Sequence, residues 1–171
     1  VDQFNPLGML RKAVEMGAKS VDHLEASTDD ELKLLAASNT MGVFLPSSGF
    51  CLHDAYARGR EIIDLGCAVA IATNYNPGSA PSPSMPFTIS LACRRLGLTP
   101  AEAITAATFN AACVLDLQSK VGTIEEGKRA DIQLLDCNDE RELAWHVSSG
   151  SPLLVAIKGE IVHLLTDGEM D

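Results

Sequence analysis

The sequence predicts an α/β protein in which a parallel β-sheet is followed by a small β unit. Runs over residues 20–24, 41–46 and 68–73 are rich in apolar side chains, as strands buried on both faces are. Helical patterns separate these runs, so that the strands recur at intervals of about 25 residues. From residue 121 the sequence becomes turn-rich and then alternates like antiparallel strands. Together these observations indicate βαβ units with an attached β segment.

The helices of the first half are predicted from apolar spacing and from their ends. Residues 7–17 place leucine and valine at helical spacing. Thr28 followed by Glu31 forms a capping box, which marks a helix start. A further helix is expected over residues 53–65, closed by Gly66.

A long polar loop follows the third predicted strand. Residues 74–84 combine Asn, Pro, Gly and Ser, and loops of this length inside domains tend to be functional. A helix is expected over 85–96. A second capping box, Thr99 with Glu102, predicts an Ala-rich helix whose pattern continues toward residue 117.

The C-terminal part of the chain predicts a small β unit. We expect a strand over 132–136, a short helix over 140–146, and a β-hairpin within 153–165 that turns at 158–160. The predicted organisation is therefore an α/β body over residues 1–120 and a β segment over residues 121–171.

Composition excludes several classes of protein. The chain has 171 residues, 46% hydrophobic and 21% charged, which suits one globular domain and excludes wholesale disorder. Thirteen basic and 23 acidic residues give a net charge of −10, which disfavours nucleic acid and anionic membrane surfaces as partners. No apolar run reaches the roughly 18 residues of a membrane span.

The cysteines and the first residues bear on location. Five widely spaced cysteines without a CxxC pair indicate reduced thiols in a cytoplasmic protein and argue against a structural zinc site. The sequence begins at Val1 with neither Met nor a signal peptide, and we interpret this start as a cut edge.

Chemistry is expected where the parallel strands end, because ligands bind at the carboxyl ends of such strands. His23, Pro46 and Asn74 hold these positions. As a metal ligand or a group that polarises a carbonyl, His23 would suit a hydrolase site. A hydrogen-bonded core histidine has the same local pattern, so both interpretations stay open.

The loop that begins at Asn74 has two interpretations as well. Asn74 and Asn76 offer carboxamides, and Gly78 lets the backbone approach a ligand closely, as in a substrate-binding loop. The same residues are ordinary in a turn-rich connector.

The remaining histidines give weaker signals. His53 and Asp54 are a candidate catalytic pair, but the pattern favours a loop or a first helical turn, where Asp54 would suit a helix N-terminus. His146 and His163 lie away from the strand ends and are interpreted as structural or surface groups.

Several motifs extend over most of the chain. They are SVDHLE at 20–25, ATNYNPGS at 72–79, SMP at 84–86, LAC at 91–93, TFNAA at 108–112 and GTIEEGKRADI at 122–132. With these motifs the sequence resembles the imidazolonepropionase family of the metal-dependent amidohydrolase superfamily. The loop motif at 72–79 carries the resemblance to the family, whereas the last two motifs are shared across the superfamily. The opening VDQF is similar to the end of a family strand with the pattern His-x-(Asp/Glu)-(Gln/Glu).

The resemblance implies both a fold and a reaction. The fold is the C-terminal part of a distorted (β/α)₈ TIM-like barrel plus C-terminal strands of a small β-sandwich domain. The reaction is hydrolysis of the cyclic amide of 4-imidazolone-5-propanoate to N-formimidoyl-L-glutamate in histidine degradation. One zinc or iron ion activates the water in this reaction. The implied partner is the small-molecule substrate, and a homodimer is left open.

The resemblance also assigns roles to residues of this chain. His23 would orient or polarise the substrate carbonyl, and Gln3 would contact the substrate ring. Asn76 and Gly78 would line the substrate site.

One position departs from the family pattern. The family has a metal-binding, proton-shuttling Asp where this chain has Asn74. A neutral amide is a weaker metal ligand and accepts no proton, and loss of a general base costs about 10²- to 10⁴-fold in rate. The other metal ligands of the family lie upstream of Val1. Two alternatives therefore stand beside the hydrolase: a non-catalytic homologue or inactive fragment, and another cyclic-amide amidohydrolase. These 171 residues alone are predicted to show no independent catalysis.

Overall fold

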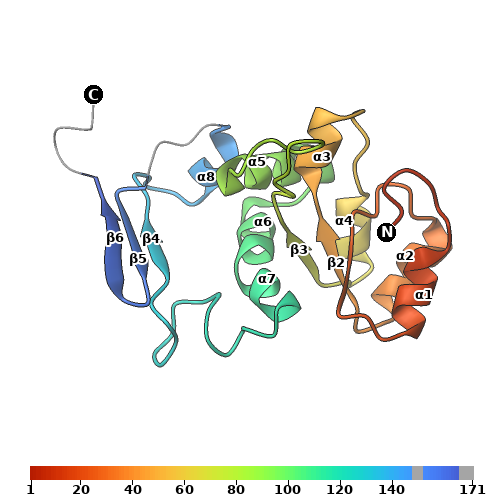
Figure 1. The fold of residues 1–171 in the computed structure, drawn as a ribbon, viewed down its shortest axis with the longest axis horizontal. Coiled ribbons are helices and arrows are strands. Elements are labelled where there is room, and N and C mark those ends of the chain that lie inside the picture. The colour runs from red at the N-terminus through yellow and green to blue at the C-terminus, as the bar shows by residue number, and fades with distance from the viewer. Residues whose placement is uncertain (148–151, 166–171) are drawn as a thin grey trace.

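Two β-sheets of different type organise the molecule (Figure 1). The structure is a computed structural model that describes residues 1–147 and 152–165. Its first part combines a parallel sheet with helices, and its second part contains an antiparallel sheet. The predicted α/β body and β segment are both present, although positions 148–151 and 166–171 of the predicted segment lie outside the described residues.

The parallel sheet has the strand order β1–β2–β3. Its strands are β1 (Ser20–Asp22), β2 (Met41–Phe44) and β3 (Val69–Ile71). Every residue of β2 and β3 is buried, as expected for strands covered on both faces. Because the strands are parallel and adjacent, their carboxyl ends meet at one edge of the sheet.

Seven helices accompany the parallel sheet in the described part of the chain. They are α1 (Met9–Glu15), α2 (Asp29–Ala36), α3 (Pro46–Cys51), α4 (Gly59–Asp64), α5 (Met85–Leu96), α6 (Pro100–Ala107) and α7 (Phe109–Val114). Both predicted capping boxes are confirmed. The Glu31 carboxylate accepts from the Thr28 amide at 2.9 Å, and the Glu102 carboxylate accepts from the Thr99 amide at 2.8 Å.

Two predictions in the first half were wrong in detail. The helix expected over 53–65 begins only at Gly59, because Asp54 has φ 57°, outside the helical region. The strand expected over 41–46 ends at Phe44, and Pro46 instead opens α3. Proline is favoured in the first helical turn, where it loses no intrahelical hydrogen bond. The Pro-Ser-Ser-Gly sequence had no helical periodicity by which α3 could be predicted.

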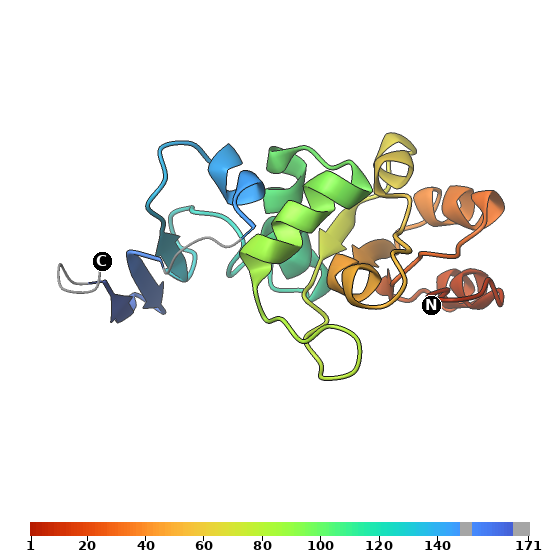
Figure 2. The ribbon, with the colours of Figure 1, turned by 90° about the horizontal axis from the view of Figure 1, so that it is seen from above.

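The core lies between the sheet and its helices (Figure 2). Leu10 of α1, Leu35 of α2, Phe44 of β2 and Ile62 of α4 are all fully buried in it. The loop that follows β3 extends away from this body in Figure 2. The loop nevertheless contacts the body, because Asn74 donates to Ser48 of α3 and Ala80 is fully buried.

The second sheet is antiparallel and has the order β4–β5–β6. Its strands are β4 (Ile132–Leu134), β5 (Leu154–Ile157) and β6 (Glu160–Leu164). The predicted hairpin is confirmed: Lys158 and Gly159 connect β5 to β6, both with positive φ. A two-residue turn with two positive φ values matches the twist of the flanking strands.

One helix of the C-terminal segment packs on the N-terminal body. α8 (Arg141–Trp145) contacts α5 and α6, and Ala144 belongs to the main core. The Arg94 guanidinium of α5 lies 5.2 Å from the Trp145 ring centroid, and it donates to the Trp145 carbonyl at 3.0 Å. The two sheets thus lie in different parts of the chain, while α8 packs against the first part, and the predicted domain boundary at residue 120 stays a prediction.

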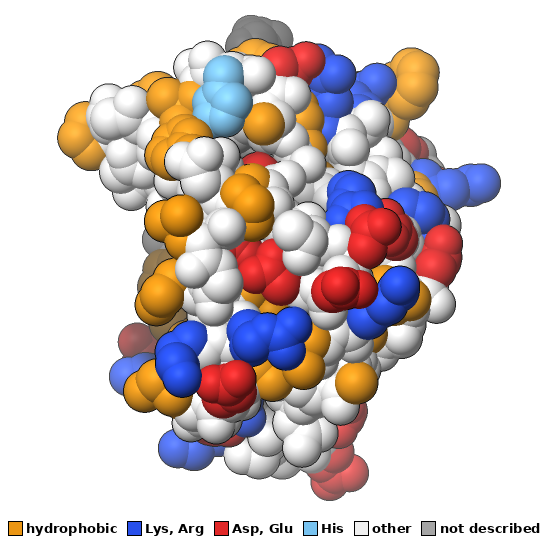
Figure 3. All heavy atoms as spheres, turned by 90° about the vertical axis from the view of Figure 1, so that its right-hand side faces the viewer, with side chains coloured by type: hydrophobic (Ala, Val, Ile, Leu, Met, Phe, Trp, Pro, Cys, Tyr) orange, Lys and Arg blue, Asp and Glu red, His pale blue; other side chains and the backbone are white. Residues whose placement is uncertain are grey.

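The face that carries the N-terminal elements is mixed in character (Figure 3). Acidic and basic side chains alternate over much of it. Phe4, Leu7, Met9 and Met16 of the N-terminal segment are all more than half exposed. No helix in the described part of the chain is long and apolar enough to cross a membrane.

Candidate functional site at the carboxyl ends of the parallel strands

The strand topology brings the three predicted positions to one edge. His23 directly follows β1, Pro46 begins two residues after β2, and Asn74 follows β3. Backbone hydrogen bonds extend the pairing past the strand ends: the His23 amide donates to the Val43 carbonyl at 3.0 Å, and the Ala72 amide to the Phe44 carbonyl at 3.1 Å. The carboxyl edge therefore brings together the residues that follow all three strands, although Pro46 is buried in α3, and the functional roles of His23 and Asn74 stay predictions.

His23 is a half-enclosed side chain with a carboxylate partner. Its Nδ1 lies 3.1 Å from Oε1 of Glu25, and the exposed fractions of the two side chains are 18% and 6%. The histidine is thus hydrogen-bonded, as in the core interpretation, yet its other ring nitrogen, Nε2, has no partner among the residues that the structure describes. Nε2 is the atom that this site offers to a ligand.

Asn74 is anchored to α3, the helix that follows β2. Its Nδ2 donates to Oγ of Ser48 at 2.7 Å, and Ser48 is almost completely buried in α3. The neighbouring Ser47 Oγ lies 3.4 Å from Oγ1 of Thr88, which belongs to α5. With Nδ2 engaged in this way, Oδ1 is the Asn74 atom left to accept a hydrogen bond or to contact a cation.

Gln3 lies in the opening segment, which resembles the end of a family strand in sequence but does not form a strand in the structure. Residues 1–5 are not a strand, because Asp2 has φ 52° and directs the chain away from a ladder. Val1 and Asp2 still flank the end of β1: the Leu24 amide donates to the Val1 carbonyl at 3.2 Å, and the Ala26 amide to the Asp2 carbonyl at 2.8 Å. Gln3 is therefore held near the same edge, partly buried.

A buried carboxylate supports this segment. The Asp2 side chain accepts from Oγ of Ser27 at 2.9 Å, and both residues are buried. The other carboxylate oxygen, Oδ1, is buried without a hydrogen-bond partner in the described part of the chain. An unsatisfied buried polar atom is uncommon in native proteins and calls for an explanation.

The loop after β3 is organised by Asn76. Its Oδ1 accepts from the backbone amides of Gly78 and Ser79 at 2.9 and 2.8 Å, and its Nδ2 donates to the Asn74 carbonyl at 2.6 Å. Asn76 and Ala80 form an isolated antiparallel bridge across the loop. The Asn76 side chain is thus used within the loop, as in an Asx-turn. Contact of Asn76 and Gly78 with a substrate stays a prediction, and it would depend on the loop shape that these bonds fix.

Left-handed backbone conformations concentrate at this edge. Asp2, His23, Leu24 and Asn74 have φ values of 52°, 82°, 77° and 52°. Each is a non-glycine residue, for which this region costs of order 1–3 kcal/mol. Such residues cluster at functional sites, because a rigid surrounding structure holds them there. The sequence signal for these conformations was weak: Asp, His and Asn adopt them more readily than other non-glycine residues, whereas leucine does not.

The described residues do not by themselves make a metal centre. No three His, Cys, Asp or Glu side chains in the described ranges are arranged to hold an ion. At the strand edge the candidate ligand atoms are Nε2 of His23 and Oδ1 of Asn74. A catalytic zinc needs three protein ligands, so this donor set does not fit a metal ion.

The other histidines do not join this edge. His53 lies in a loop, its ring centroid 5.3 Å from that of Phe4, and Asp54 pairs with Arg95 at 3.1 Å. Asp54 therefore does not lie at a helix N-terminus, contrary to the alternative that the sequence favoured. His146 is exposed, and Nε2 of His163 lies 3.0 Å from the Pro152 carbonyl, so both agree with structural or surface roles.

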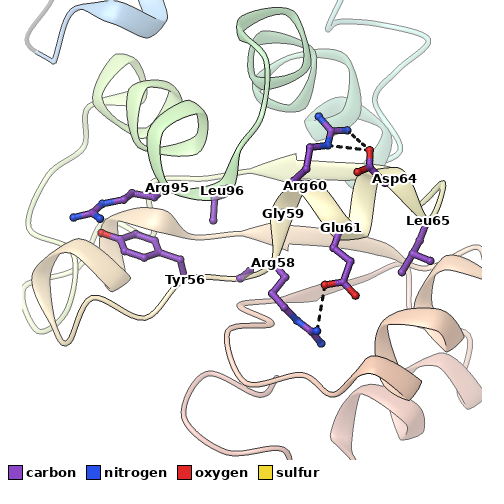
Figure 4. Close-up of a pocket in the computed structure, with 10 residues that line it drawn as sticks. Tyr56, Arg58, Gly59, Arg60, Glu61, Asp64, Leu65, Arg95 and Leu96 are labelled. Atoms are coloured by element: carbon purple, nitrogen blue, oxygen red, sulfur yellow. Dashed lines mark hydrogen bonds and ion pairs between the residues drawn. The ribbon is translucent and has the colours of Figure 1, made fainter.

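An open depression of about 600 Å³ lies elsewhere, over α4 and the last turn of α5 (Figure 4). Three arginines line it, and each already has acidic partners. Arg58 pairs with Glu61 at 3.2 Å, Arg60 with Asp64 at 2.9 Å, and Arg95 with Asp54 at 3.1 Å. Paired guanidinium groups leave little positive charge for an anionic ligand, so this depression is a weaker candidate than the strand edge.

Sequence reasoning missed four residues of the edge, namely Glu25, Ser48, Asp2 and Ser27. Glu25 stood in the SVDHLE motif without a role, and its two-residue separation from His23 was the available signal. Ser48 belongs to the unpredicted helix α3, and the Asp2–Ser27 contact joins residues 25 positions apart. Nothing in the sequence pattern indicated a role for Ser48 or the contact between Asp2 and Ser27.

Comparison with known proteins gives a consistent family. Residues 1–162 match the sequence profile described as the amidohydrolase family. Imidazolonepropionase from Symbiobacterium thermophilum is 43% identical over 162 residues, covering 94% of this chain and 38% of that protein. The protein of the same name from Rubrobacter xylanophilus is 45% identical over 157 residues, covering 92% and 38%. The chain thus spans less than two-fifths of the length of these curated relatives.

Solved structures share the fold. A zinc-bound adenosine deaminase from Xanthomonas campestris superposes with a TM-score of 0.80 at 22% identity, covering 95% of this chain and 42% of that chain. A mutant atrazine chlorohydrolase from Arthrobacter aurescens, complexed with zinc and atraton, gives 0.71 at 21% identity, covering 85% and 36%. At such identities the likeness concerns the fold alone.

Proposed function

The chain belongs to the amidohydrolase family, and on that premise we propose that a protein of its relatives' full length hydrolyses the ring amide of 4-imidazolone-5-propanoate. The identity of 41–45% to several curated imidazolonepropionases carries this proposal. The presence of His23 and Asn74 at one strand edge supports it. The fold is that expected for the C-terminal part of the family's barrel.

In the proposed reaction, the oxygen of water bonds to the ring carbonyl carbon and the ring C–N bond breaks. The oxygen remains in the new carboxylate, and the departing ring nitrogen takes up a proton, which gives N-formimidoyl-L-glutamate. Nε2 of His23 faces the carbonyl and exchanges a proton or hydrogen bond with it. Gln3 contacts the ring, and the loop organised by Asn76 closes over the substrate, with Gly78 at the approach.

Activation of the water belongs to groups outside the described residues. Two of the structural neighbours contain zinc, and we propose a divalent metal ion, zinc or iron, for the full-length protein. The donors present in this chain do not complete its coordination. We also place the protein in the cytoplasm, because its five cysteines are all unpaired.

The test joins this chain to the N-terminal part of a relative that the chain does not cover. Loss of the imidazolone chromophore and formation of N-formimidoyl-L-glutamate are followed by absorbance and mass spectrometry. We expect turnover when Asn74→Asp is included, and a loss of about 10²- to 10⁴-fold when His23→Gln is added. His146→Gln, an exposed histidine, is the matched control. Absence of turnover in the metal-loaded Asn74→Asp protein would refute the proposed activity.

A second candidate function rests on Asn74 alone. Its amide nitrogen is bonded to Ser48, and a neutral amide neither binds a cation strongly nor accepts a proton. A homologue that binds its ligand without turnover would have such a residue. The two functions separate in the same joined protein with Asn74 retained: ligand binding without turnover or bound metal supports the binding protein, and stoichiometric metal contradicts it.

A further inference from the structure

We propose that Glu25 is a positioning residue that fixes the proton of His23 on Nδ1 and thereby presents Nε2 at the strand edge. The two residues are only two positions apart, and their side chains meet because both His23 and Leu24 have left-handed backbone conformations. In an extended strand, residues 23 and 25 would project in parallel on one face without turning toward each other. The contact is therefore a product of the strained turn.

The chemistry of the pair determines which ring nitrogen carries hydrogen. An ionised carboxylate offers only acceptor oxygens, and opposite an ionised Glu25 the 3.1 Å contact with Oε1 places the proton on Nδ1 of His23. In the neutral imidazole, Nε2 then has a free lone pair. Without such a partner, a histidine ring in water favours the opposite arrangement, with hydrogen on Nε2. Glu25 thus selects the less common tautomer.

Burial makes this selection strong. The Glu25 side chain is 6% exposed, and its second oxygen, Oε2, is buried without a partner in the described residues. His23 provides the one side-chain hydrogen bond to Glu25 among the described residues, and a hydrogen bond to a charged acceptor is stronger where water is excluded. The His23 backbone is fixed in turn by the hydrogen bond that its amide donates to the Val43 carbonyl.

The meaning of this geometry for catalysis rests on the proposed function. If Nε2 faces the substrate carbonyl, the neutral His23 ring with hydrogen on Nδ1 can accept a proton at Nε2. The resulting imidazolium donates that proton back, and Glu25 stabilises its charge in the meantime. Other acidic residues near this turn contribute less, because Asp22 is exposed and Asp2 is engaged by Ser27. The selection of the His23 tautomer by Glu25 does not depend on the reaction, so the tautomer is measured independently.

The decisive experiment is ¹⁵N NMR of the histidine rings in the 171-residue chain, at a pH where His23 is neutral. We expect Nδ1 of His23 to resonate as a protonated nitrogen and Nε2 as an unprotonated one. Glu25→Met keeps an unbranched side chain but removes the acceptor, so it should move His23 to the Nε2-protonated form. Glu25→Gln keeps a neutral acceptor and should give a mixture. Glu126→Gln, in an exposed turn, should change nothing.

Two outcomes would overturn the inference. One is an Nε2-protonated His23 in the unmodified chain, and the other is a tautomer that does not change in either Glu25 variant. Folding of each variant is checked by the methyl resonances of the core, so that a tautomer change is scored only in folded protein.

Turnover in the joined protein tests the catalytic consequence separately. Glu25→Gln should lower kcat by about 10- to 100-fold with little change in KM, because a carboxylate behind a histidine orients the ring and does not touch the substrate. An unchanged kcat would refute the positioning role. Absence of turnover in every variant would refute the proposed function and leave the tautomer result intact.

Discussion

The contact between Arg60 and Glu102 joins α4 to α6 and yields a quantitative prediction about pH. The Glu102 Oε2 atom accepts from the Thr99 amide at 2.8 Å and from Arg60 Nη1 at 2.8 Å, and Oε1 accepts from both Arg60 nitrogens at 3.1 Å. The Arg60 guanidinium and the Thr99 amide lower the pKa of Glu102 from 4.5 to about 2. One carboxylate therefore serves a helix cap and an interhelical ion pair at once.

The sign and size of the effect follow from this pKa. Because the pKa is lower in the folded state, the stabilisation is complete above pH 4.5 and is lost as the pH falls from 4.5 toward 2. Without solvent screening, the difference between the unfolded and folded pKa values of Glu102 would correspond to about 3 kcal/mol of stability. The side chain is one-third exposed, so solvent screening reduces the expected contribution to about 1 kcal/mol.

Glu102→Gln isolates the charge, because glutamine also completes a capping box. Urea unfolding followed by circular dichroism should show the variant about 1 kcal/mol less stable than the parent at pH 7, with the difference shrinking toward pH 3.5. Glu126→Gln, which removes the same charge from an exposed turn, should show no such trend. Equal stability of Glu102→Gln and the parent at pH 7, or a difference that is constant with pH, would refute the reasoning.

Three further predictions concern packing and buried polar groups. Gly59→Ala should lower the free energy of unfolding by about 1–3 kcal/mol, measured by urea unfolding, because a Cβ at position 59 would lie 2.7 Å from Cβ of Leu96; a stability gain would contradict this. Ser27→Ala should cost about 1–3 kcal/mol in thermal unfolding by leaving the buried Asp2 carboxylate without its hydroxyl donor, and an unchanged midpoint would count against that contact. Asn76→Ala should accelerate amide exchange and proteolytic cleavage in the loop while barely altering global stability, and unchanged cleavage would show that the loop does not depend on this side chain.

Features with local physical causes could be predicted from the sequence. The capping boxes at Thr28 and Thr99 each depend on two residues three positions apart, and both formed as expected. The turn at Lys158 depends on the glycine beside it, and its hairpin formed too. The apolar runs indicated parallel strands, and parallel pairing alone placed His23 and Asn74 at a common edge.

Features that depend on tertiary contact escaped prediction. The short helix α3 has no periodic pattern, and it is held by the packing of its buried serines against α5. The left-handed conformation is disfavoured for Leu24, and the tolerance of histidine for it is too weak to predict it at His23. The pairing of Glu25 with His23 follows from that conformation, so this pairing could not be predicted from the sequence either.

The left-handed backbone at His23 and Asn74 has a consequence for sequence variation under selection. Glycine adopts such angles freely, whereas other residues lose about 1–2 kcal/mol there. In a mutant library sorted only for cellular abundance, glycine should become enriched at positions 23 and 74. A library of the joined protein sorted for ligand turnover should discard those same clones. Positions where glycine is enriched in the first library and depleted in the second would identify the functional site without any homologous sequence.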